Sequence, residues 1–140
     1  MAIEKTELID NLAYGVDIHN RRIYFGINLD IGDVEESTSF TISSVEYAIR
    51  AIHRMASDAP NKPIELHVCS YGGDIYSMLR LYDEIQACPC QVKFYGGGAI
   101  MSAATMIMAG CDERFLYPNA TIMVHLSLIH ISEPTRPERI

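Results

Sequence analysis

The chain has 140 residues, 49% of them hydrophobic, and a formal net charge of −7 at pH 7. This length suits one domain, and this apolar content is enough to build a core. The basic residues are scattered, with Arg21–Arg22 the only adjacent pair before the C-terminal tail. Because binding to a phosphate backbone needs a clustered cationic face, the composition argues against a nucleic-acid partner.

The sequence lacks the patterns of exported, membrane-spanning and zinc-binding proteins. No apolar run reaches the length of about 18 residues that suggests a membrane span, and the start has neither a basic region nor an apolar stretch typical of a secretory signal. We therefore expect a cytoplasmic protein with no membrane partner. The cysteines lack paired C-x-x-C spacing, and the two thiols of Cys88-Pro89-Cys90 are too few for a tetrahedral site. We interpret Cys69, Cys88, Cys90 and Cys111 as reduced and structurally incidental, and we expect no metal and no cofactor.

After an N-terminal segment of residues 1–20, the first half of the chain predicts one strand and one helix. Residues 21–26, RRIYFG, are β-branched and aromatic, as in a short strand. Residues 41–57 have apolar positions at helical spacing, and Ser43 and Glu46 have the spacing of a capping box. The expected apolar face of this helix consists of Val45, Ala48, Ile49, Ile52 and Met55.

The second half alternates strands and helices. Residues 64–70 predict a strand that ends at Tyr71-Gly72-Gly73, and residues 91–96 predict one that runs into Gly96, Gly97 and Gly98. A helix is expected from Asp74 to Cys88, with Ile75, Met78, Leu79, Tyr82 and Ile85 on its apolar face. A second helix is expected from about Ala99 to Gly110, followed by strands over 114–118 and 121–125. This order predicts an α/β fold with a largely parallel sheet and with both glycine turns at strand carboxyl ends, where ligand sites form.

Ser102 and His125 are the candidate chemical groups. A serine hydroxyl becomes nucleophilic only when a base takes its proton, and the oxyanion that forms needs donors aimed at it. A serine in the first turn of a helix lies among unpaired backbone N–H groups, and a histidine at a strand end could supply the base. Taken alone, such a serine is usually a packing residue. Ser70 and Ser77 are rivals without a G-x-S-x-G motif, and the glycine run lacks the pattern of a nucleotide phosphate loop.

Three segments change this assessment: SYGGDIYSMLRLYDEI, GGGAIMSAATMIMAG and LYPNATIMVH. Their order and spacing resemble those of the ClpP-like serine peptidases, the proteolytic subunits of the caseinolytic (Clp) protease. The resemblance covers approximately residues 23–125. Its most specific part is G-x-x-x-S at Gly98 to Ser102 and L-x-P-N-x-x-x-M-x-H at Leu116 to His125. It implies a ClpP/crotonase-like repeated β-β-α superhelix with a largely parallel sheet.

The resemblance also implies roles. Ser102 is the expected nucleophile and His125 the general base, and the amides of Gly73 and Ala103 form the expected oxyanion hole. Gly72 and Gly98 are expected to contact substrate. The family would make the parent protein a homo-oligomeric, ring-forming serine endopeptidase that degrades unfolded polypeptides supplied by an AAA+ unfoldase.

Two departures from the family pattern flank the expected oxyanion hole. Tyr71 replaces the usual proline before the paired glycines, and Ala103-Ala104 replaces the usual Met-Gly after the serine. A backbone N–H donor is indifferent to its own side chain. We therefore expect the hole to survive both changes.

The C-terminal residues 126–140 do not resemble the family. Leu126 to Arg136 match the in-frame translation of a transposase sequencing adapter, so we interpret 21–125 as a partial domain followed by a non-native tail. The family's triad aspartate is expected downstream of His125, in the part that this tail replaces. Asp112, Glu113 and Glu133 are poor substitutes, because the first two precede the histidine in a turn and the third lies in the tail. Since loss of the acid can reduce turnover by about 10⁴-fold, we expect this chain to be inactive or weakly active.

Two alternatives stay open. Crotonase-type enzymes share the general fold and an oxyanion hole of two amides, but act on acyl-CoA without a Ser-His pair. A catalytically silent Clp subunit is the other alternative, although Ser102 and His125 are both present.

Overall fold

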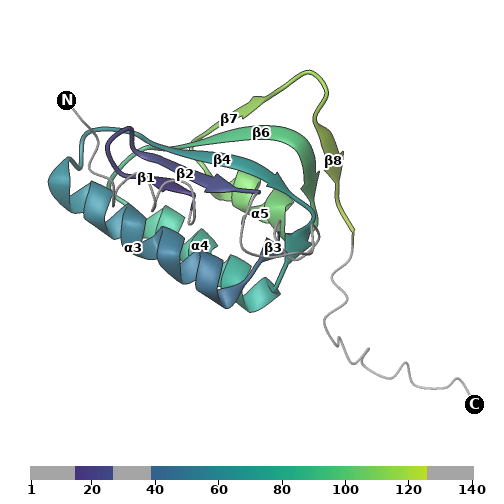
Figure 1. Cartoon of the computed structure of the whole chain (residues 1–140), viewed down its shortest axis with the longest axis horizontal. Coiled ribbons are helices and arrows are strands. Elements are labelled where there is room, and N and C mark those ends of the chain that lie inside the picture. The colour runs from purple at the N-terminus through teal and green to yellow at the C-terminus, as the bar shows by residue number, and fades with distance from the viewer. Residues whose placement is uncertain (1–14, 27–38, 126–140) are drawn as a thin grey trace, which may run out of the picture.

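The structure is a computed structural model that describes residues 15–26 and 39–125. Its larger sheet has the strand order β1–β2–β4–β6–β7, with β8 also paired to β6 (Figure 1). β1 pairs antiparallel with β2, and the other pairings of this sheet are parallel. The α/β class with a mostly parallel sheet is therefore confirmed. The strands are β1 (Val16–Asp17), β2 (Arg22–Phe25), β4 (Ile64–Ser70), β6 (Val92–Met101), β7 (Glu113–Leu116) and β8 (Thr121–Met123).

Three helices cover one face of this sheet (Figure 1). They are α3 (Ile42–Asp58), α4 (Ile75–Ala87) and α5 (Ala103–Gly110). A small parallel pair, β3 (Ser39–Phe40) and β5 (Gly72–Gly73), lies immediately before α3 and α4 in the chain. None of the helices within the described residues is long and apolar enough to span a membrane.

Helix α3 confirms the predicted apolar face but corrects its cap. Val45, Ala48, Ile49, Ile52 and Met55 are all buried against the sheet, as the helical spacing predicted. The capping box is formed by Thr41 and Ser44, not by Ser43 and Glu46: the Ser44 N–H donates to Thr41 Oγ1 (3.2 Å) and the Thr41 N–H donates to Ser44 Oγ (3.0 Å). The helix therefore begins two residues earlier than the serine-glutamate pair indicated.

Helix α4 begins at the predicted place, but its buried face is rotated. Asp74 is the N-cap, and its carboxylate accepts hydrogen bonds from the N–H and the hydroxyl of Ser77, both at 2.7 Å. Met78, Leu81 and Ile85 are buried, whereas Leu79 is 42% exposed. Leu79 was therefore wrongly assigned to the core, and Leu81 was missed.

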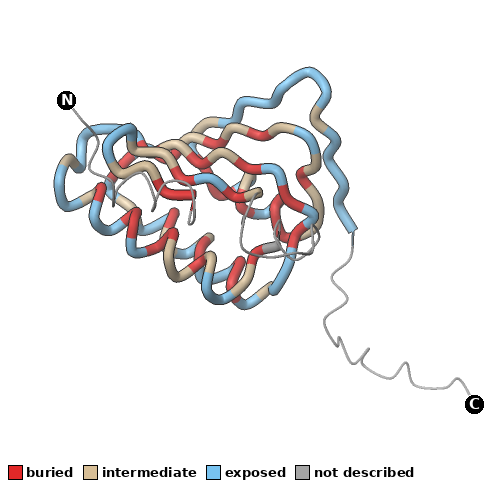
Figure 2. Tube along the Cα trace, viewed as in Figure 1, coloured by how far each residue is buried: buried red, intermediate tan, exposed pale blue. Residues whose placement is uncertain are grey.

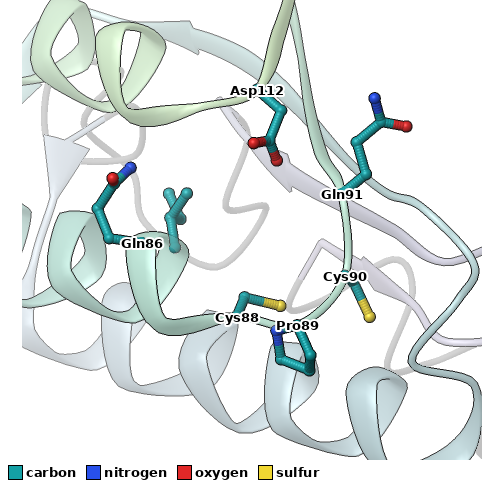
Figure 3. Close-up of a pocket in the computed structure, with 7 residues that line it drawn as sticks. Gln86, Cys88, Pro89, Cys90, Gln91 and Asp112 are labelled. Carbon is teal, nitrogen blue, oxygen red and sulfur yellow. The ribbon is translucent and has the colours of Figure 1, made fainter.

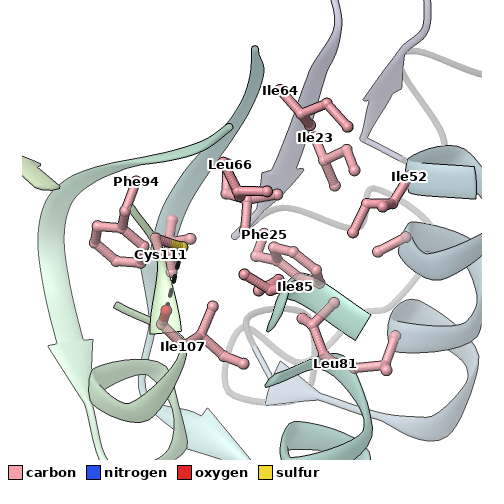
Figure 4. Close-up of a cluster of buried hydrophobic side chains, with 14 of the residues drawn as sticks. Ile23, Phe25, Ile52, Ile64, Leu66, Leu81, Ile85, Phe94, Ile107 and Cys111 are labelled. Carbon is pink, nitrogen blue, oxygen red and sulfur yellow. Dashed lines mark hydrogen bonds between the residues drawn. The ribbon is translucent and has the colours of Figure 1, made fainter. Parts of the chain in front are cut away.

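The core lies between the sheet and the helices, as the buried residues in Figure 2 show. Alternate residues of β4 point inward, namely Ile64, Leu66 and Val68, and meet side chains from the neighbouring strands and from α3, α4 and α5 (Figure 4). Phe94 is fully buried among them. Burying one such side chain contributes about 1.5–3 kcal/mol, so the one-sided alternation fixes which face of the sheet the helices cover.

The opposite face of the sheet carries a row of stacked rings. Tyr24, His67, Tyr95 and Phe115 come from four adjacent strands in register, with ring centroids 4.9, 4.8 and 4.8 Å apart along the row. Tyr24 and Phe115 are each 44% exposed. No helix within the described residues covers this row.

The glycine run lies inside a strand, which corrects the predicted strand-to-helix turn. β6 continues through Gly96, Gly97 and Gly98 to Met101, so the helix begins at Ala103 and not near Ala99. The first half of β6 pairs with β7, and residues 99–101 pair with β8. Opposite β4, Val68 pairs with Gly96 but Ser70 with Ile100, so β6 carries two more residues than β4 over this stretch. Glycine suits this irregularity because Gly98 has φ +65°.

Candidate active site

Ser102 forms the junction between β6 and α5. Its φ is +53° and its ψ is −122°, a conformation that L-residues other than glycine rarely adopt. Only Ser102 and Arg21 among the non-glycine residues described have a positive φ. A strained serine between a strand and a helix is the backbone arrangement of a nucleophile elbow, although this chain reaches it without the G-x-S-x-G motif.

Main-chain hydrogen bonds hold this strained residue on both sides. The Ser102 N–H donates to the Met123 carbonyl of β8 (2.9 Å), and the Ser102 carbonyl accepts from the N–H (3.0 Å) and the hydroxyl (2.6 Å) of Thr105. The Ser102 side chain forms no capping hydrogen bond with α5 and is partly exposed. Its backbone is therefore fixed while its hydroxyl is not used by the helix.

Gly72 allows β5 to approach Ser102 closely. A Cβ atom on Gly72 would lie 2.8 Å from the Ser102 Cβ and 3.1 Å from the Ala103 nitrogen, and Gly72 has φ +111°. Ser70, which is buried, shapes the turn before it, because its hydroxyl accepts from the Gly72 N–H (3.1 Å) and donates to the Gly72 carbonyl (3.3 Å). A side chain at position 72 would push the serine and the start of α5 away.

The pairing of β3 with β5 sets the orientation of the next residue, Gly73. It pairs with Phe40, and the Asp74 N–H donates to the Phe40 carbonyl (2.9 Å). Because successive N–H groups of a strand point to opposite sides, the Gly73 N–H points away from β3. A Cβ on Gly73 would lie 2.4 Å from the Phe40 oxygen, so this position also needs glycine.

Ala103 is the first residue of α5 and is almost fully buried. The first N–H groups of a helix have no partner within the helix, so such an amide is free to bind an oxyanion. The structure thus brings Gly72, Ser102 and Ala103 into contact and leaves Gly73 next to them in the chain.

His125 reaches the same end of the sheet through β8. β8 runs parallel to β6 with Met101 opposite Met123, so Ser102 and His125 both follow the paired ends of these strands. The predicted strand ends at Met123, two residues before the histidine, which is exposed. Within the described part of the chain, no hydrogen bond joins His125 to Ser102 or to a carboxylate. The structure thus places the pair at one end of the sheet without the contact that catalysis needs.

The remaining predicted site residues lie elsewhere. Gly98 faces β4, where a Cβ would lie 2.9 Å from the Cys69 sulfur. The Asp112 carboxylate accepts from the Val92 N–H (2.7 Å) at the start of β6, and Glu113 lies 3.3 Å from Lys93 at the same end. Both acids are thus at the end of β6 opposite Ser102, which agrees with their rejection as triad members. Glu133 and the tail lie outside the described residues.

Sequence reasoning missed two positioning residues, Ser70 and Asp74. A serine two residues before a glycine pair can close a turn, and an aspartate three residues before a serine is an N-cap signal. The hydrogen bonds from Ser77, first from its side chain, hold the pKa of Asp74 below its usual value. Among residues 15–26 and 39–125 no cluster of three or more metal-ligating side chains occurs.

Comparison with known proteins agrees with this architecture. The sequence model of the Clp protease family matches residues 17–135, which extends ten residues past His125. ATP-dependent Clp protease proteolytic subunit 2 of Corynebacterium diphtheriae is 30% identical over 73 residues, 51% of this chain and 37% of that protein. The proteolytic subunit of Bdellovibrio bacteriovorus is 34% identical over 74 residues, 51% of this chain and 35% of that protein. The matched segment thus spans little more than a third of these relatives. Because the family model matches most of its length, the chain belongs to the Clp protease family.

Proposed function

We propose that this chain is part of the proteolytic subunit of a Clp-type protease and that its chemistry is serine peptide hydrolysis. Ser102 is the nucleophile, His125 is the general base, and the amides of Gly73 and Ala103 stabilise the oxyanion. The observation that carries the proposal is the strained Ser102 backbone, held against Gly72 at the point where β8 leads to His125.

The proposed reaction follows from these positions. His125 takes the Ser102 proton as the hydroxyl oxygen attacks the peptide carbonyl, and the two amides bind the negative oxygen of the tetrahedral intermediate. The imidazolium then protonates the leaving amine. Water next attacks the acyl-enzyme while His125 takes its proton, and the Ser102 oxygen leaves and regains a proton from the imidazolium. The imidazole must move into hydrogen-bond reach of Ser102 for the first step.

We expect the third triad member to be an aspartate in the uninterrupted parent sequence. The reading of residues 126–140 as an adapter-derived tail stays a prediction, as do the boundaries of the partial domain. Sequencing the uninterrupted gene tests both. An aspartate in a family-like segment after His125 is the expected result, whereas the LSLIHISEPTR sequence in the natural gene would contradict it.

A fluorophosphonate probe on the full-length gene product tests the nucleophile. We expect one label on Ser102 and its complete loss in Ser102→Ala. Ser57→Ala is the matched control, because Ser57 is an exposed serine of α3 whose hydroxyl donates only to the His53 carbonyl (2.9 Å). Undiminished labelling in Ser102→Ala would exclude the assignment. Loss of the label in Ser70→Ala, with the label retained in Ser102→Ala, would identify Ser70 as the nucleophile.

The two alternatives have separate tests. Thermal stabilisation by an acyl-CoA would favour a crotonase-type enzyme, and a labelled but turnover-silent full-length protein with no downstream acid would favour an inactive subunit. The strained serine beside Gly72 supports the peptidase over the crotonase-type enzyme, because an acyl-CoA site of two amides has no need for it.

We also propose that the parent protein forms rings, receives unfolded polypeptides from an AAA+ unfoldase and works in the cytoplasm. Exposed apolar side chains on β7, on β8 and immediately after each strand support an assembly surface: Phe115, Leu116, Tyr117, Ile122, Met123 and Val124. Figure 2 shows the segment from β7 to β8 exposed along most of its length. Because so much apolar surface is costly in water, we expect this chain alone to aggregate. A monodisperse monomer or a complete double ring in size-exclusion chromatography would contradict that expectation.

A further inference from the structure

We propose that Cys88 and Cys90 form a modification site, a dithiol that a low-molecular-weight disulfide such as glutathione disulfide converts into an intramolecular disulfide. The two cysteines flank Pro89 in the connection between α4 and β6. This connection lies at the end of β6 opposite Ser102. The site is therefore separate from the proposed peptidase centre.

Both cysteines line one cavity of about 330 Å³ (Figure 3). Its lining residues are Ile85, Gln86, Cys88, Pro89, Cys90, Gln91 and Asp112. Cys88 is partly exposed, whereas Cys90 is only 3% exposed. A reagent that enters the cavity therefore meets Cys88 first, and Cys90 is the thiol placed to react second.

The two cysteines are separated by Pro89 alone, and both line the same cavity. Residues two apart in the chain have Cα atoms at most about 7 Å apart, since an extended chain spans at most about 3.6 Å per residue. Disulfides join Cα atoms up to about 7 Å apart, so ring closure needs side-chain movement rather than rearrangement of the sheet.

Arg21 and α3 hold the second thiol in place. Arg21 Nη2 donates to the Cys90 sulfur (3.3 Å), and the Cys90 thiol donates to the Ala59 carbonyl (3.7 Å) at the C-cap of α3. Oxidation removes the S–H hydrogen and therefore this last bond. Disulfide formation would thus remove a contact at the C-terminus of α3.

The other described cysteines have different surroundings. Cys69 is exposed at the end of β4. Cys111 is buried, and its thiol donates a hydrogen bond to the Ile107 carbonyl (3.2 Å). Burial raises the pKa of Cys111 to about 12, so this thiol stays protonated and unreactive. Within the described residues, Cys88 and Cys90 are thus the pair suited to ring closure.

The exchange balances in two steps. The Cys88 thiol loses its proton and attacks one sulfur of glutathione disulfide, which forms a mixed disulfide and releases one glutathione thiolate. The Cys90 thiol then loses its proton and attacks the Cys88 sulfur, which expels the second glutathione thiolate. Both released thiolates take up the protons, so two protein thiols are oxidised and one glutathione disulfide is reduced to two glutathiones.

The test uses the full-length gene product, reduced, freed of reductant and treated with glutathione disulfide. Burial raises the pKa of the Cys88 thiol, against the lowering effect of the Arg21 charge. The Asp112 carboxylate lines the same cavity. The exchange is therefore run at alkaline pH, where the attacking thiolate forms. Acid quenching, digestion with trypsin without reduction and mass spectrometry follow, because residues 81–93 form one tryptic peptide with both thiols.

We expect this peptide to lose two hydrogen atoms and to regain them with dithiothreitol, while Cys111 stays reduced. Cys69→Ser is the matched control and should close the ring as completely as the parent chain. In Cys90→Ser we expect glutathione to remain on Cys88, with complete loss of ring closure. Should that variant fail to fold, Cys88→Ser serves instead and should leave Cys90 reduced. A stable mixed disulfide on Cys88 in the parent chain, or modification confined to Cys69, would overturn the proposal.

Discussion

The two ends of strand β6 are built in opposite ways. At the carboxyl end, two glycines let main-chain segments approach closely: Gly72 lies against Ser102, and the neighbouring Gly73 lies against Phe40. At the amino end, side chains fill the space, and the Arg21 guanidinium donates to four main-chain carbonyls. Those acceptors are Pro63, Met55, Ala59 and Lys62, at 3.0, 2.7, 3.1 and 2.9 Å from the nearest Arg21 nitrogen.

Each end also holds one of the two described non-glycine residues with a positive φ, Ser102 and Arg21. Arg21 is held by main-chain hydrogen bonds with Ile18 and Glu65, and its side chain is used as well, in four hydrogen bonds to main-chain carbonyls. Ser102 offsets its strain with main-chain hydrogen bonds to Met123 and Thr105, which leave the hydroxyl available. The difference teaches that strain alone does not mark a reactive residue. Ser102 is available for chemistry because the hydrogen bonds that hold its strained backbone do not use its hydroxyl.

The largest effect should come from Gly72→Ala. The new Cβ would lie 2.8 Å from the Ser102 Cβ at a φ of +111°, so Ser102 and α5 must shift. We expect a loss of about 2–3 kcal/mol in the free energy of unfolding. A shift of this kind at a reactive group can cost about 10²-fold, which we expect in the rate of fluorophosphonate labelling.

Gly97→Ala is the matched control for this prediction. Gly97 has no left-handed φ, and its Cβ would meet the ring of Tyr117 at 3.1 Å, an exposed side chain that can move. Labelling of this variant should stay close to that of the parent. Equal losses in both variants would show that the close approach of Gly72 to Ser102 is not what positions the serine.

Arg21→Ala should have the next largest effect. It removes all four hydrogen bonds to main-chain carbonyls near the end of α3 and the contact with Cys90, at a partly buried position. We expect about 2 kcal/mol of destabilisation in urea unfolding followed by circular dichroism. The neighbouring Arg22→Ala removes one ion pair with Glu65 (2.8 Å) and should cost less than about 1 kcal/mol. Similar losses in the two variants would contradict the stabilising role of the Arg21 hydrogen bonds.

Asp112→Ala tests the same end through a single bond. The variant leaves the N–H of the fully buried Val92 without its 2.7 Å acceptor. An unsatisfied buried donor costs about 1–3 kcal/mol, so a loss in that range is expected in urea unfolding. Glu113→Ala, next in the chain, removes only contacts with Lys93 and Gln91 near the surface and should change stability by less than about 1 kcal/mol.

Asp74→Ala should have the smallest effect and tests a side-chain bond at the glycine-rich end. Loss of the cap that accepts from Ser77 should cost about 1 kcal/mol at pH 7. Because the pKa of Asp74 is lowered in the folded state, this stabilisation is present above the unfolded pKa of about 3.9 and is lost as pH falls through the folded pKa. Unfolding curves of parent and variant should therefore begin to converge below about pH 4 and coincide once the pH is below the folded pKa. A constant difference down to pH 2 would argue against the carboxylate cap.

Local patterns in the sequence were sufficient for the elements of the fold. Helical spacing located α3 and its buried residues from Val45 to Met55, and the alternation in residues 64–70 located β4. These features depend on neighbours a few residues apart, so the sequence alone contains them. The family resemblance nominated Ser102 and His125, and the family itself is confirmed by the match over residues 17–135.

Only the tertiary structure decided what the glycines do and how Ser102 is held. The run from Gly96 to Gly98 looked like a turn, yet β6 passes through it because β7 and β8 pair with successive halves of the strand. Gly72 meets Ser102, and Arg21 meets the end of α3, across about 30 residues or more of chain. Strand pairing and close approach between distant segments depend on the whole packed sheet, and no local propensity encodes them.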